Sequence, residues 1–222
     1  MFEIEKVDME HIDRIRPLWE KLIQANAANS PYFADYYGTF EFEIRKGFLQ
    51  EKLDNGAAMY TAVLVDREKK QDAGFVTVTY NRDTSFGEIE MLYLLEEYRG
   101  QGMGKKLFKM ALSCLDINCI RDRKLCVTYG NEAALRLYES FGFYPFTIDC
   151  LQKRSLSGSC RNRKGPAIVR GLFAWAGSIR RQSGGEGSAR KLCVTYGNEA
   201  ALRLYESFGF YLFTIDCLQK RS

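Results

Sequence analysis

The sequence from Glu88 to Leu115 decides the fold, because it joins a strand, a glycine-rich turn and an amphipathic helix. It begins with the apolar strand Glu88-Ile89-Glu90-Met91-Leu92-Tyr93-Leu94 and continues through the turn Arg99-Gly100-Gln101-Gly102-Met103-Gly104. A glycine-rich turn before a helix leaves backbone N–H groups without intrahelical partners, and the helix dipole adds partial positive charge there. The pattern therefore predicts a phosphate-binding turn. The helix itself is indicated by apolar residues on one face, at Leu107, Met110, Ala111, Cys114 and Leu115.

The glycine spacing excludes two common phosphate-binding motifs. A P-loop has four residues between its glycines, whereas Gly100 and Gly104 enclose only three. The dinucleotide fingerprint G-x-G-x-x-G does not match either, since the glycines fall as G-x-G-x-G. What remains is Arg-x-x-Gly-x-Gly, formed by Arg99, Gly102 and Gly104. This closely resembles the pyrophosphate-binding signature of the GNAT superfamily, the acetyl-CoA-dependent N-acetyltransferases; from the residues alone, an ordinary strand-to-helix turn is the alternative.

A second stretch carries the same resemblance. The sequence VTYGNEAALRLYESFGF at residues 127–143 resembles the later motif of that family, a strand followed by a capped short helix and Gly-Phe. Asn131 is a good N-cap, and Gly142 suits the left-handed residue that ends a helix. Because the two motifs occur in the family's order and separation, the resemblance covers about residues 1–155.

The resemblance implies an α+β fold with a GNAT-like mixed, mostly antiparallel sheet and helices on both faces. The pattern of the chain agrees with it. Strands are predicted at 59–65 and 74–80, before the strand that contains Glu88, and a crossover through the Gly102 helix leads to a parallel strand near Leu125. Amphipathic helices are predicted from His11 to about Ala27 and from about Phe40 to Leu53.

The resemblance also implies acetyl-CoA as co-substrate. Backbone amides of the turn would hold its pyrophosphate, and its pantetheine arm would lie along the end of the strand. Asn131 would cap its helix and touch the cofactor arm. The predicted cofactor-binding residues are Leu92, Leu94, Arg99, Gly100, Gln101, Gly102, Met103, Gly104 and Asn131.

Acetyl transfer to an amine needs a base and an acid. An alkyl amine with a reference pKa of about 10.4 is protonated at neutral pH, so a base must remove that proton. Glu88 corresponds in position to the base of several family members, and Glu90, two residues on, is the competing candidate. Tyr138 is the predicted acid for the departing thiolate. The alternatives are a solvated pair of strand carboxylates and a tyrosine that fills the core. A metal site or a Ser-His triad is not expected, because His11 is the only histidine.

The acceptor pocket is harder to predict. The stretch Tyr32-Phe33-Ala34-Asp35-Tyr36-Tyr37 is unusually aromatic for a loop. In GNAT enzymes this region between the first two helices commonly forms the acceptor pocket. The alternative, equally consistent with the residues, is that the aromatic side chains cover the core.

The end of the chain is a near-perfect internal duplication. Residues 190–222 repeat residues 123–155 and differ only in that Leu212 replaces Pro145. The predicted organisation is a GNAT acetyltransferase domain at 1–155, a Gly/Ser/Arg-rich linker at 156–189 and a duplicated strand-helix-strand fragment at 190–222. We expect the first copy to complete the sheet and the second to be loosely docked, disordered or exchanged with another protomer. Exposed aromatic residues of the second copy would favour aggregation or a homodimer; they are Phe208, Phe210 and Phe213.

The charge distribution bears on partners. The whole chain carries a net charge of +4, but the linker has six basic residues against one acidic and the second copy five against three, so residues 1–155 carry −3. A mildly acidic domain suits a cationic amine, and nucleic-acid binding is not expected because the basic residues cluster in the linker. No run of eighteen or more apolar residues occurs and Met1–Lys6 does not resemble a signal peptide, so a soluble cytoplasmic protein without membrane contact is expected.

These features predict an N-acetyltransferase that moves an acetyl group from acetyl-CoA to a primary amine of a small molecule or peptide by direct attack. The alternative is a non-catalytic acyl-CoA-binding GNAT-like module whose duplicated tail mediates self-association.

Overall fold

The computed structural model describes residues 1–152, 191–207 and 210–219 of the 222-residue chain. The chain divides into two compact units. One unit comprises Met1–Tyr144 together with Cys217–Ser222, and the other comprises Pro145–Asp216.

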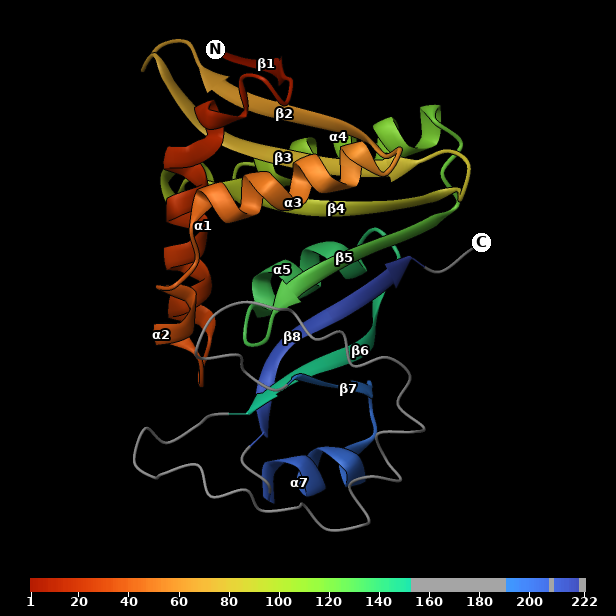
Figure 1. Ribbon diagram of the computed structural model, residues 1–222. Helices are drawn as coiled ribbons and strands as arrows, with labels where there is room; N and C mark the ends of the chain where they lie inside the picture. The colour runs from red at the N-terminus through yellow and green to blue at the C-terminus, as the bar shows by residue number, and fades with distance from the viewer. Residues whose placement is uncertain (153–190, 208–209, 220–222) are drawn as a thin grey trace. The chain divides into compact units, whose positions relative to one another are not determined.

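In the first unit, strands β1 to β5 form a mixed sheet in the order β1-β2-β3-β4-β5 (Figure 1). Neighbouring strands pair antiparallel from β1 to β4, and β4 and β5 run parallel. This confirms the predicted mixed, mostly antiparallel sheet. The bounds are β1 Phe2–Val7, β2 Ala58–Asp66, β3 Gln71–Asn81, β4 Phe86–Leu94 and β5 Asp122–Thr128.

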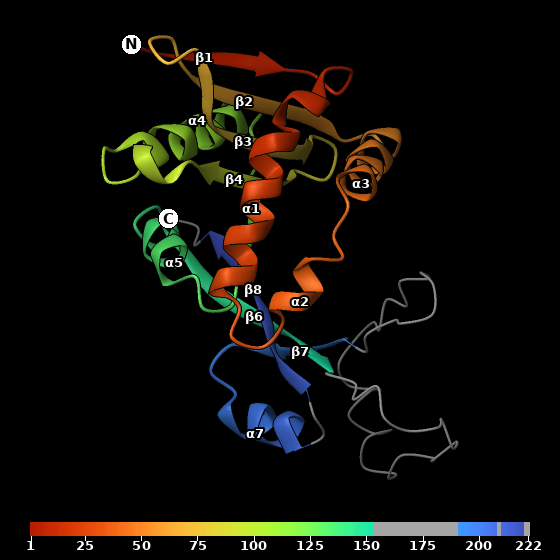
Figure 2. The same cartoon turned by 90° about the vertical axis from the view of Figure 1, so that its left-hand side faces the viewer.

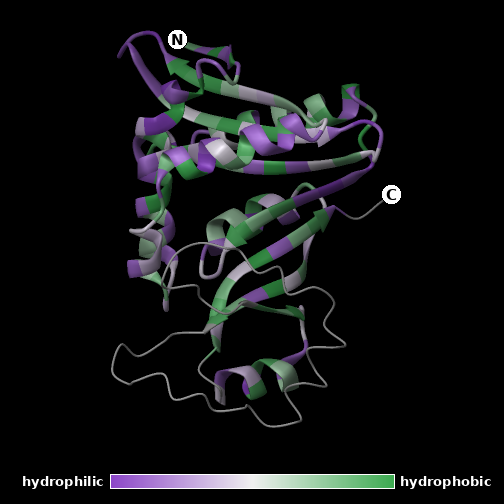
Figure 3. Cartoon of the chain, in the orientation of Figure 1, coloured by the Kyte–Doolittle hydropathy of each residue, from purple (hydrophilic) through white to green (hydrophobic). Residues whose placement is uncertain are grey.

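Helices cover both faces of this sheet, as predicted. Figures 1 and 2 show α3 and α4 on opposite sides of β2, β3 and β4. Strands covered on both faces are buried almost without interruption, which is the pattern along β2 and β3 and agrees with their mainly hydrophobic colour in Figure 3. The helices are η1 Ile12–Ile15, α1 Arg16–Asn29, α2 Ala34–Tyr37, α3 Phe42–Asp54, η2 Glu96–Tyr98, α4 Met103–Ile117 and α5 Glu132–Glu139.

The helix after the glycine turn, α4, is anchored by one fully buried face. Leu107, Phe108, Ala111 and Leu115 have no exposed surface. Phe108 was missing from the predicted apolar face, which placed Met110 and Cys114 beside the other three; both of those are only half-buried. The face is rotated toward Phe108 because three aromatic rings, of Tyr138, Phe141 and Phe143, contact the Phe108 ring at centroid distances of 4.9–5.7 Å.

The second unit is built mainly from the two copies of the duplicated sequence. Strand β6, Phe143–Gln152, belongs to the first copy, and β7, Lys191–Thr195, α7, Glu199–Ser207, and β8, Phe210–Gln219, belong to the second. β6 has β7 on one side, where the pairing is antiparallel, and β8 on the other.

Several expectations for the duplicated copies need correction. The described residues of the second copy form regular strands and a helix, so of the three expected states, loosely docked, disordered or exchanged, the disordered one does not apply to them. Phe210 is buried rather than exposed and Phe213 is half-buried, because both lie on β8; Phe208 lies outside the described residues. The first copy does not complete the first unit alone, since the end of β8 from the second copy, Cys217 to Gln219, also belongs to that unit, where the Gln219 amide donates to the carbonyl of Phe141 at 3.1 Å. The predicted linker, 156–189, lies outside the described residues.

Candidate active site

Strands β4 and β5 pair along only part of their length. Four residue pairs join them, and the last is Ile89 with Leu125, although β4 continues to Leu94 and β5 to Thr128. On the other side of β4, the register with β3 shifts and leaves Glu90 as an extra residue. A bulge of this kind bends its strand locally. The two parallel strands therefore diverge beyond Ile89.

The divergence leaves backbone donors of β4 facing away from β3. The N–H of Leu95 donates to the carbonyl of Ala73 in β3, with an N···O distance of 2.9 Å. Because successive N–H groups of an extended chain alternate in direction, those of Leu92 and Leu94 point to the opposite edge of β4. That edge is the one from which β5 has separated, so these donors can serve a ligand.

The glycine turn after β4 is shaped for an anion. Gly100 and Gly102 have φ angles of 75° and 79°, which favour glycine, and a Cβ at either residue or at Gly104 would meet nothing within 4 Å. Gly102 is the N-cap of α4 and provides no side-chain cap, and no acidic residue lies in the first turn of the helix. The first N–H groups of α4 therefore lack a side-chain acceptor, and the helix dipole favours a negative group beside them.

Arg99 fixes the turn to the end of β4. Its Nε donates to the carbonyl of Leu94 at 3.1 Å, and its guanidinium carbon lies 5.6 Å from the centre of the Tyr93 ring. Gln101 holds the other side of the turn by donating to the carbonyl of Glu97 at 2.9 Å. Since Arg99 is bound to a backbone carbonyl, the turn presents mainly backbone amides to a ligand.

The two predicted base candidates share one cation but differ in exposure. Lys52, on α3, donates to Glu88 Oε2 at 2.7 Å and also bonds Glu90 Oε1. Glu90 additionally accepts from Arg45 Nη2 at 2.7 Å and from the Thr79 hydroxyl. The Glu90 side chain is only 3% exposed, whereas that of Glu88 is 21% exposed.

These contacts set the charge of Glu90. Burial by itself would raise its pKa, but the positive charges of Arg45 and Lys52 and the hydrogen bond from Thr79 outweigh burial. The pKa of Glu90 is therefore lowered, and Glu90 is a buried, paired carboxylate. Glu88 is the more accessible of the two.

Helix α5 carries the two remaining predicted residues. Asn131 caps the helix, since its side-chain oxygen accepts from the N–H of Ala134 at 3.1 Å. Tyr138 is buried in the last turn of the helix, where the centre of its ring lies 5.2 Å from the centre of the Phe108 ring. Burial raises the pKa of the Tyr138 phenol, so the phenol keeps its proton at neutral pH.

The aromatic segment before α3 is divided between core and surface. Tyr37 is buried and its hydroxyl lies 2.9 Å from the Thr128 hydroxyl at the end of β5, while Phe33 is buried as well. Tyr36 and Phe40 are partly exposed and contact each other at 5.3 Å. Two rings of the segment, Phe33 and Tyr37, thus cover the core as one alternative predicted, while an acceptor pocket formed by the segment stays a prediction.

Comparison with known proteins agrees with this geometry. A family model described as the acetyltransferase (GNAT) family matches residues 19–143, more than half of the chain. The chain belongs to the GNAT family of acetyltransferases.

Three curated acetyltransferases are similar to parts of this GNAT chain. It is 36% identical over 72 residues to mycothiol acetyltransferase of Thermobispora bispora, which covers 32% of this chain and 24% of that protein. It is 32% identical over 85 residues to N-alpha-acetyltransferase 30 of Schizosaccharomyces pombe, covering 38% and 57%. It is 27% identical over 142 residues to a putative [ribosomal protein bS18]-alanine N-acetyltransferase of Bacillus subtilis, covering 64% and 80%. The matched part thus spans about a quarter of the first relative and over half of the second.

Solved structures support the fold. An N-acetyltransferase from Staphylococcus aureus Mu50 aligns with a TM-score of 0.51 at 17% identity, covering 67% of this chain and 87% of that one. The ribosomal-protein-S18-alanine N-acetyltransferase from Escherichia coli aligns with a TM-score of 0.50 at 14% identity, covering 99% and 93%. At these identities the likeness establishes the GNAT fold.

Two cations of the site were not predicted from the GNAT motifs. Arg45 and Lys52 are seven residues apart on α3, so they lie on one face of that helix, and both reach the carboxylates of β4. Their spacing was visible in the sequence. The packing of α3 over β4 could not be predicted from the sequence. It is this packing that brings Arg45 and Lys52 to Glu88 and Glu90.

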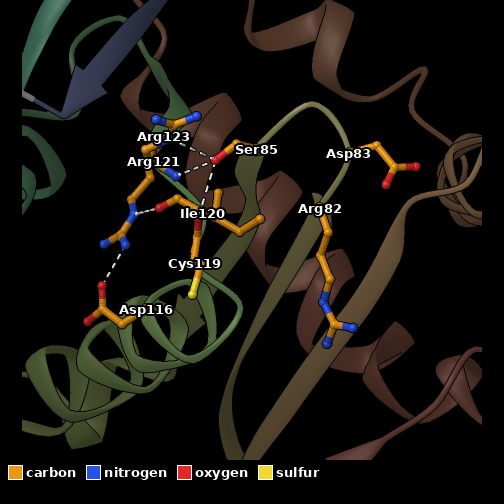
Figure 4. Close-up of a pocket in the computed structure, with 8 residues that line it drawn as sticks. All are labelled: Arg82, Asp83, Ser85, Asp116, Cys119, Ile120, Arg121 and Arg123. Carbon is orange, nitrogen blue, oxygen red and sulfur yellow. Dashed lines mark hydrogen bonds and ion pairs between the residues drawn. The ribbon is translucent and has the colours of Figure 1, made fainter.

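The other end of β4 holds a separate depression (Figure 4). It adjoins Ser85, just before β4 begins, so the length of the strand separates it from the glycine turn. Its charged groups are partly paired, with Arg123 bonded to Asp116 and Arg82 to Asn118. The lining residues are Arg82, Asp83, Ser85, Asp116, Cys119, Ile120, Arg121 and Arg123.

Two further features concern the described residues alone. Among them, no three His, Cys, Asp or Glu side chains gather as a set of metal ligands would. Of the helices in the same residues, none combines the length and apolar character needed to span a membrane.

Proposed function

We propose that this protein transfers an acetyl group from acetyl-CoA to a primary amine of a small molecule or peptide. The proposal rests on one observation. β4 diverges from β5 at the Glu90 bulge, and β4 then leads to an open glycine turn that can bind an anion. A thioester arm can enter between the strands while its diphosphate stays at the turn. This arrangement suits coenzyme A, which has both parts.

The glycine turn and strand β4 would bind different parts of acetyl-CoA. Amides of Gly100 to Gly104 would hold the pyrophosphate at the start of α4. The pantetheine arm would lie beside Leu92 and Leu94, whose N–H groups point away from β3. The N–H near Leu94 would then donate to the thioester oxygen and stabilise the negative charge that develops there.

Glu88 is the proposed base. It lies on the same strand six residues before Leu94, it is more exposed than Glu90, and it has one cationic partner where Glu90 has two. A carboxylate already bound by Arg45, Lys52 and Thr79 has little capacity to accept another proton. Lys52 would hold the Glu88 side chain in place, and the amine proton would pass to the oxygen that Lys52 does not bind, directly or through a water.

Tyr138 is the proposed acid. The amine nitrogen attacks the thioester carbon, a C–N bond forms, and the C–S bond breaks with its electron pair on sulfur. The phenol would donate a hydrogen bond to that sulfur and transfer its proton as the thiolate develops. The products are the acetylated amine and the free thiol of coenzyme A.

The acceptor is proposed to be a small-molecule or peptide amine. The names of two relatives, an N-alpha-acetyltransferase and a putative ribosomal-protein alanine N-acetyltransferase, suggest the α-amino group of a peptide as one candidate. An α-amino group has a reference pKa of about 7.7–8.0, so it loses its proton more readily than a lysine side chain. The acidic Glu88 and the partly exposed rings of Tyr36 and Phe40 are compatible with such an acceptor.

Two measurements test the proposal. Calorimetric titration of the full chain with acetyl-CoA should give binding that free acetate does not compete with. Release of free thiol should then depend on the amine in a panel of polyamines, aminoglycosides, lysine derivatives and short peptides. Binding with no thiol release for any amine would favour the non-catalytic acyl-CoA-binding module instead, and no binding would refute both.

A further inference from the structure

The two copies of the duplicated sequence meet in the second unit through their last strands. β6 reads FYPFTIDCLQ and β8 reads FYLFTIDCLQ, so the two strands differ only at Pro145 and Leu212. β6 and β8 are neighbours in the sheet. One sequence is therefore paired with itself.

The hydrogen bonds across this pair are reciprocal. The Thr147 hydroxyl donates to Asp216 Oδ2 at 3.2 Å, and the Thr214 hydroxyl donates to Asp149 Oδ2 at 3.2 Å. Thr214 is the copy of Thr147, and Asp216 is the copy of Asp149. Each strand thus gives the other the same bond that it receives, as at an interface between two identical molecules related by a two-fold axis.

The side chains between the bonded pairs follow the same symmetry. Ile148 lies between Thr147 and Asp149, and its copy Ile215 lies between Thr214 and Asp216. Both isoleucines are 3% exposed. The pairing runs in opposite directions along the two strands, since 147 meets 216 and 149 meets 214, which places the two isoleucines at its centre.

We propose that this strand pair is a self-association surface, and that two chains can exchange their second copies so that β8 of each lies on β6 of the other. The contacts within one chain and between two chains are chemically the same. A total of 38 residues, 153–190, connects β6 to β7, and at about 3.3–3.6 Å per extended residue this connection does not confine the pairing to one chain. A connected partner has an effective concentration in the millimolar range, so the exchanged dimer forms at high protein concentration or when pairing within the chain is blocked.

Charge-matched variants of the full chain test this directly. One chain carries Asp149→Lys and Thr214→Lys, and the other carries Thr214→Asp. Within either chain, two like charges then oppose each other across β6 and β8, which disfavours pairing. Exchange between the two chains places a lysine opposite an aspartate at both positions. We expect the 1:1 mixture, but neither variant alone, to sediment as a dimer of twice the monomer mass.

A control pair places the charges away from the strands, with Glu206→Lys in one chain and Arg203→Asp in the other, both on exposed positions of α7. Mixing these should leave the mass unchanged. Because the strand variants can fail to fold, wild-type chains with two different fluorescent labels are also unfolded and refolded together over a wide concentration range. Energy transfer that increases with concentration, in a species of twice the mass, supports exchange. Monomers without energy transfer at every concentration, or a strand-variant mixture that stays monomeric while folded, would overturn the proposal.

Discussion

Lys52 and Glu88 form an ion pair across α3 and β4, with Nζ 2.7 Å from Oε2. The same ammonium group bonds Glu90, so one cation holds both carboxylates that compete for the role of base. Their surroundings differ, because Glu90 is buried with a second cation, Arg45, while Glu88 retains exposed surface. This difference leads to opposite expectations for the two substitutions.

Replacing Glu88 by glutamine should remove catalysis and leave binding intact. We expect Glu88→Gln to lower turnover about 10²–10⁴-fold at neutral pH, since a positioned base contributes that much. The deficit should shrink as the pH approaches about 10, where solvent deprotonates the amine. Turnover by thiol release and acetyl-CoA affinity by calorimetry separate the two effects. Wild-type turnover in this variant at neutral pH would remove Glu88 from the mechanism.

Replacing Glu90 should affect stability instead. Glu90→Gln leaves Arg45 and Lys52 with one buried carboxylate fewer, and breaking a buried pair costs about 3–5 kcal/mol. The folded-state pKa of Glu90 is lowered, so its contribution is present above the unfolded value of about 4.5 and is lost as the pH falls through the folded pKa. The difference between variant and wild type in urea unfolding should therefore be largest near neutral pH and decrease below it. Glu51→Gln, an exposed change on α3, the helix that carries Arg45 and Lys52, is the control and should have little effect at any pH.

Gly102 should be required for acetyl-CoA binding. Gly102→Ala places a side chain at a φ of 79°, at a cost of about 1–2 kcal/mol, and adds a methyl group to the open turn. We expect acetyl-CoA affinity to fall about 10-fold or more, a loss of about 1.4 kcal/mol, because the methyl group occupies space beside the amides that would hold the pyrophosphate. Gly47→Ala is the matched control, since a Cβ there also meets nothing within 4 Å but lies on α3, away from the turn. Equal affinities for the two variants would contradict a ligand at the turn.

The duplication supplies an internal control for Tyr138. Tyr138→Phe should lower turnover with little change in acetyl-CoA affinity, since the buried ring and its contact with Phe108 remain. The equivalent residue of the second copy is Tyr205, and Tyr205→Phe should leave turnover unchanged. Turnover measured in parallel for both variants tests the acid role. A Tyr138→Phe enzyme as fast as wild type would eliminate it.

The same comparison applies to Gly130 and its copy Gly197. Both have positive φ angles, of 97° and 85°. A Cβ at Gly130 would lie 2.3 Å from the carbonyl oxygen of Asn29, whereas one at Gly197 would meet nothing within 4 Å. Gly197→Ala should therefore cost only the backbone strain, about 1–2 kcal/mol, and Gly130→Ala clearly more. Urea unfolding of the two variants gives the comparison, and equal losses would show that the loop before α5 does not press on the end of α1.

The patterns that depend on neighbouring residues were readable from the sequence. The glycine turn, the Asn131 cap and the order of strands and helices follow from local spacing, and each has the predicted form in the structure. Phe108 was missed because the aromatic rings that surround it come from residues 30 or more positions away.

By itself, the amino-acid sequence determined the fold class, the glycine-rich turn before α4 and the presence of two nearly identical copies. These features follow from the local pattern of residues and from the direct comparison of residues 123–155 with 190–222. Only the tertiary structure decided which carboxylate is accessible, since Arg45 and Lys52 reach Glu88 and Glu90 from a distant helix. It also decided how the copies pair. Two strands that differ at one residue have nearly the same local preferences, so the choice of β8 as the partner of β6 depends on long-range contacts that no local pattern records.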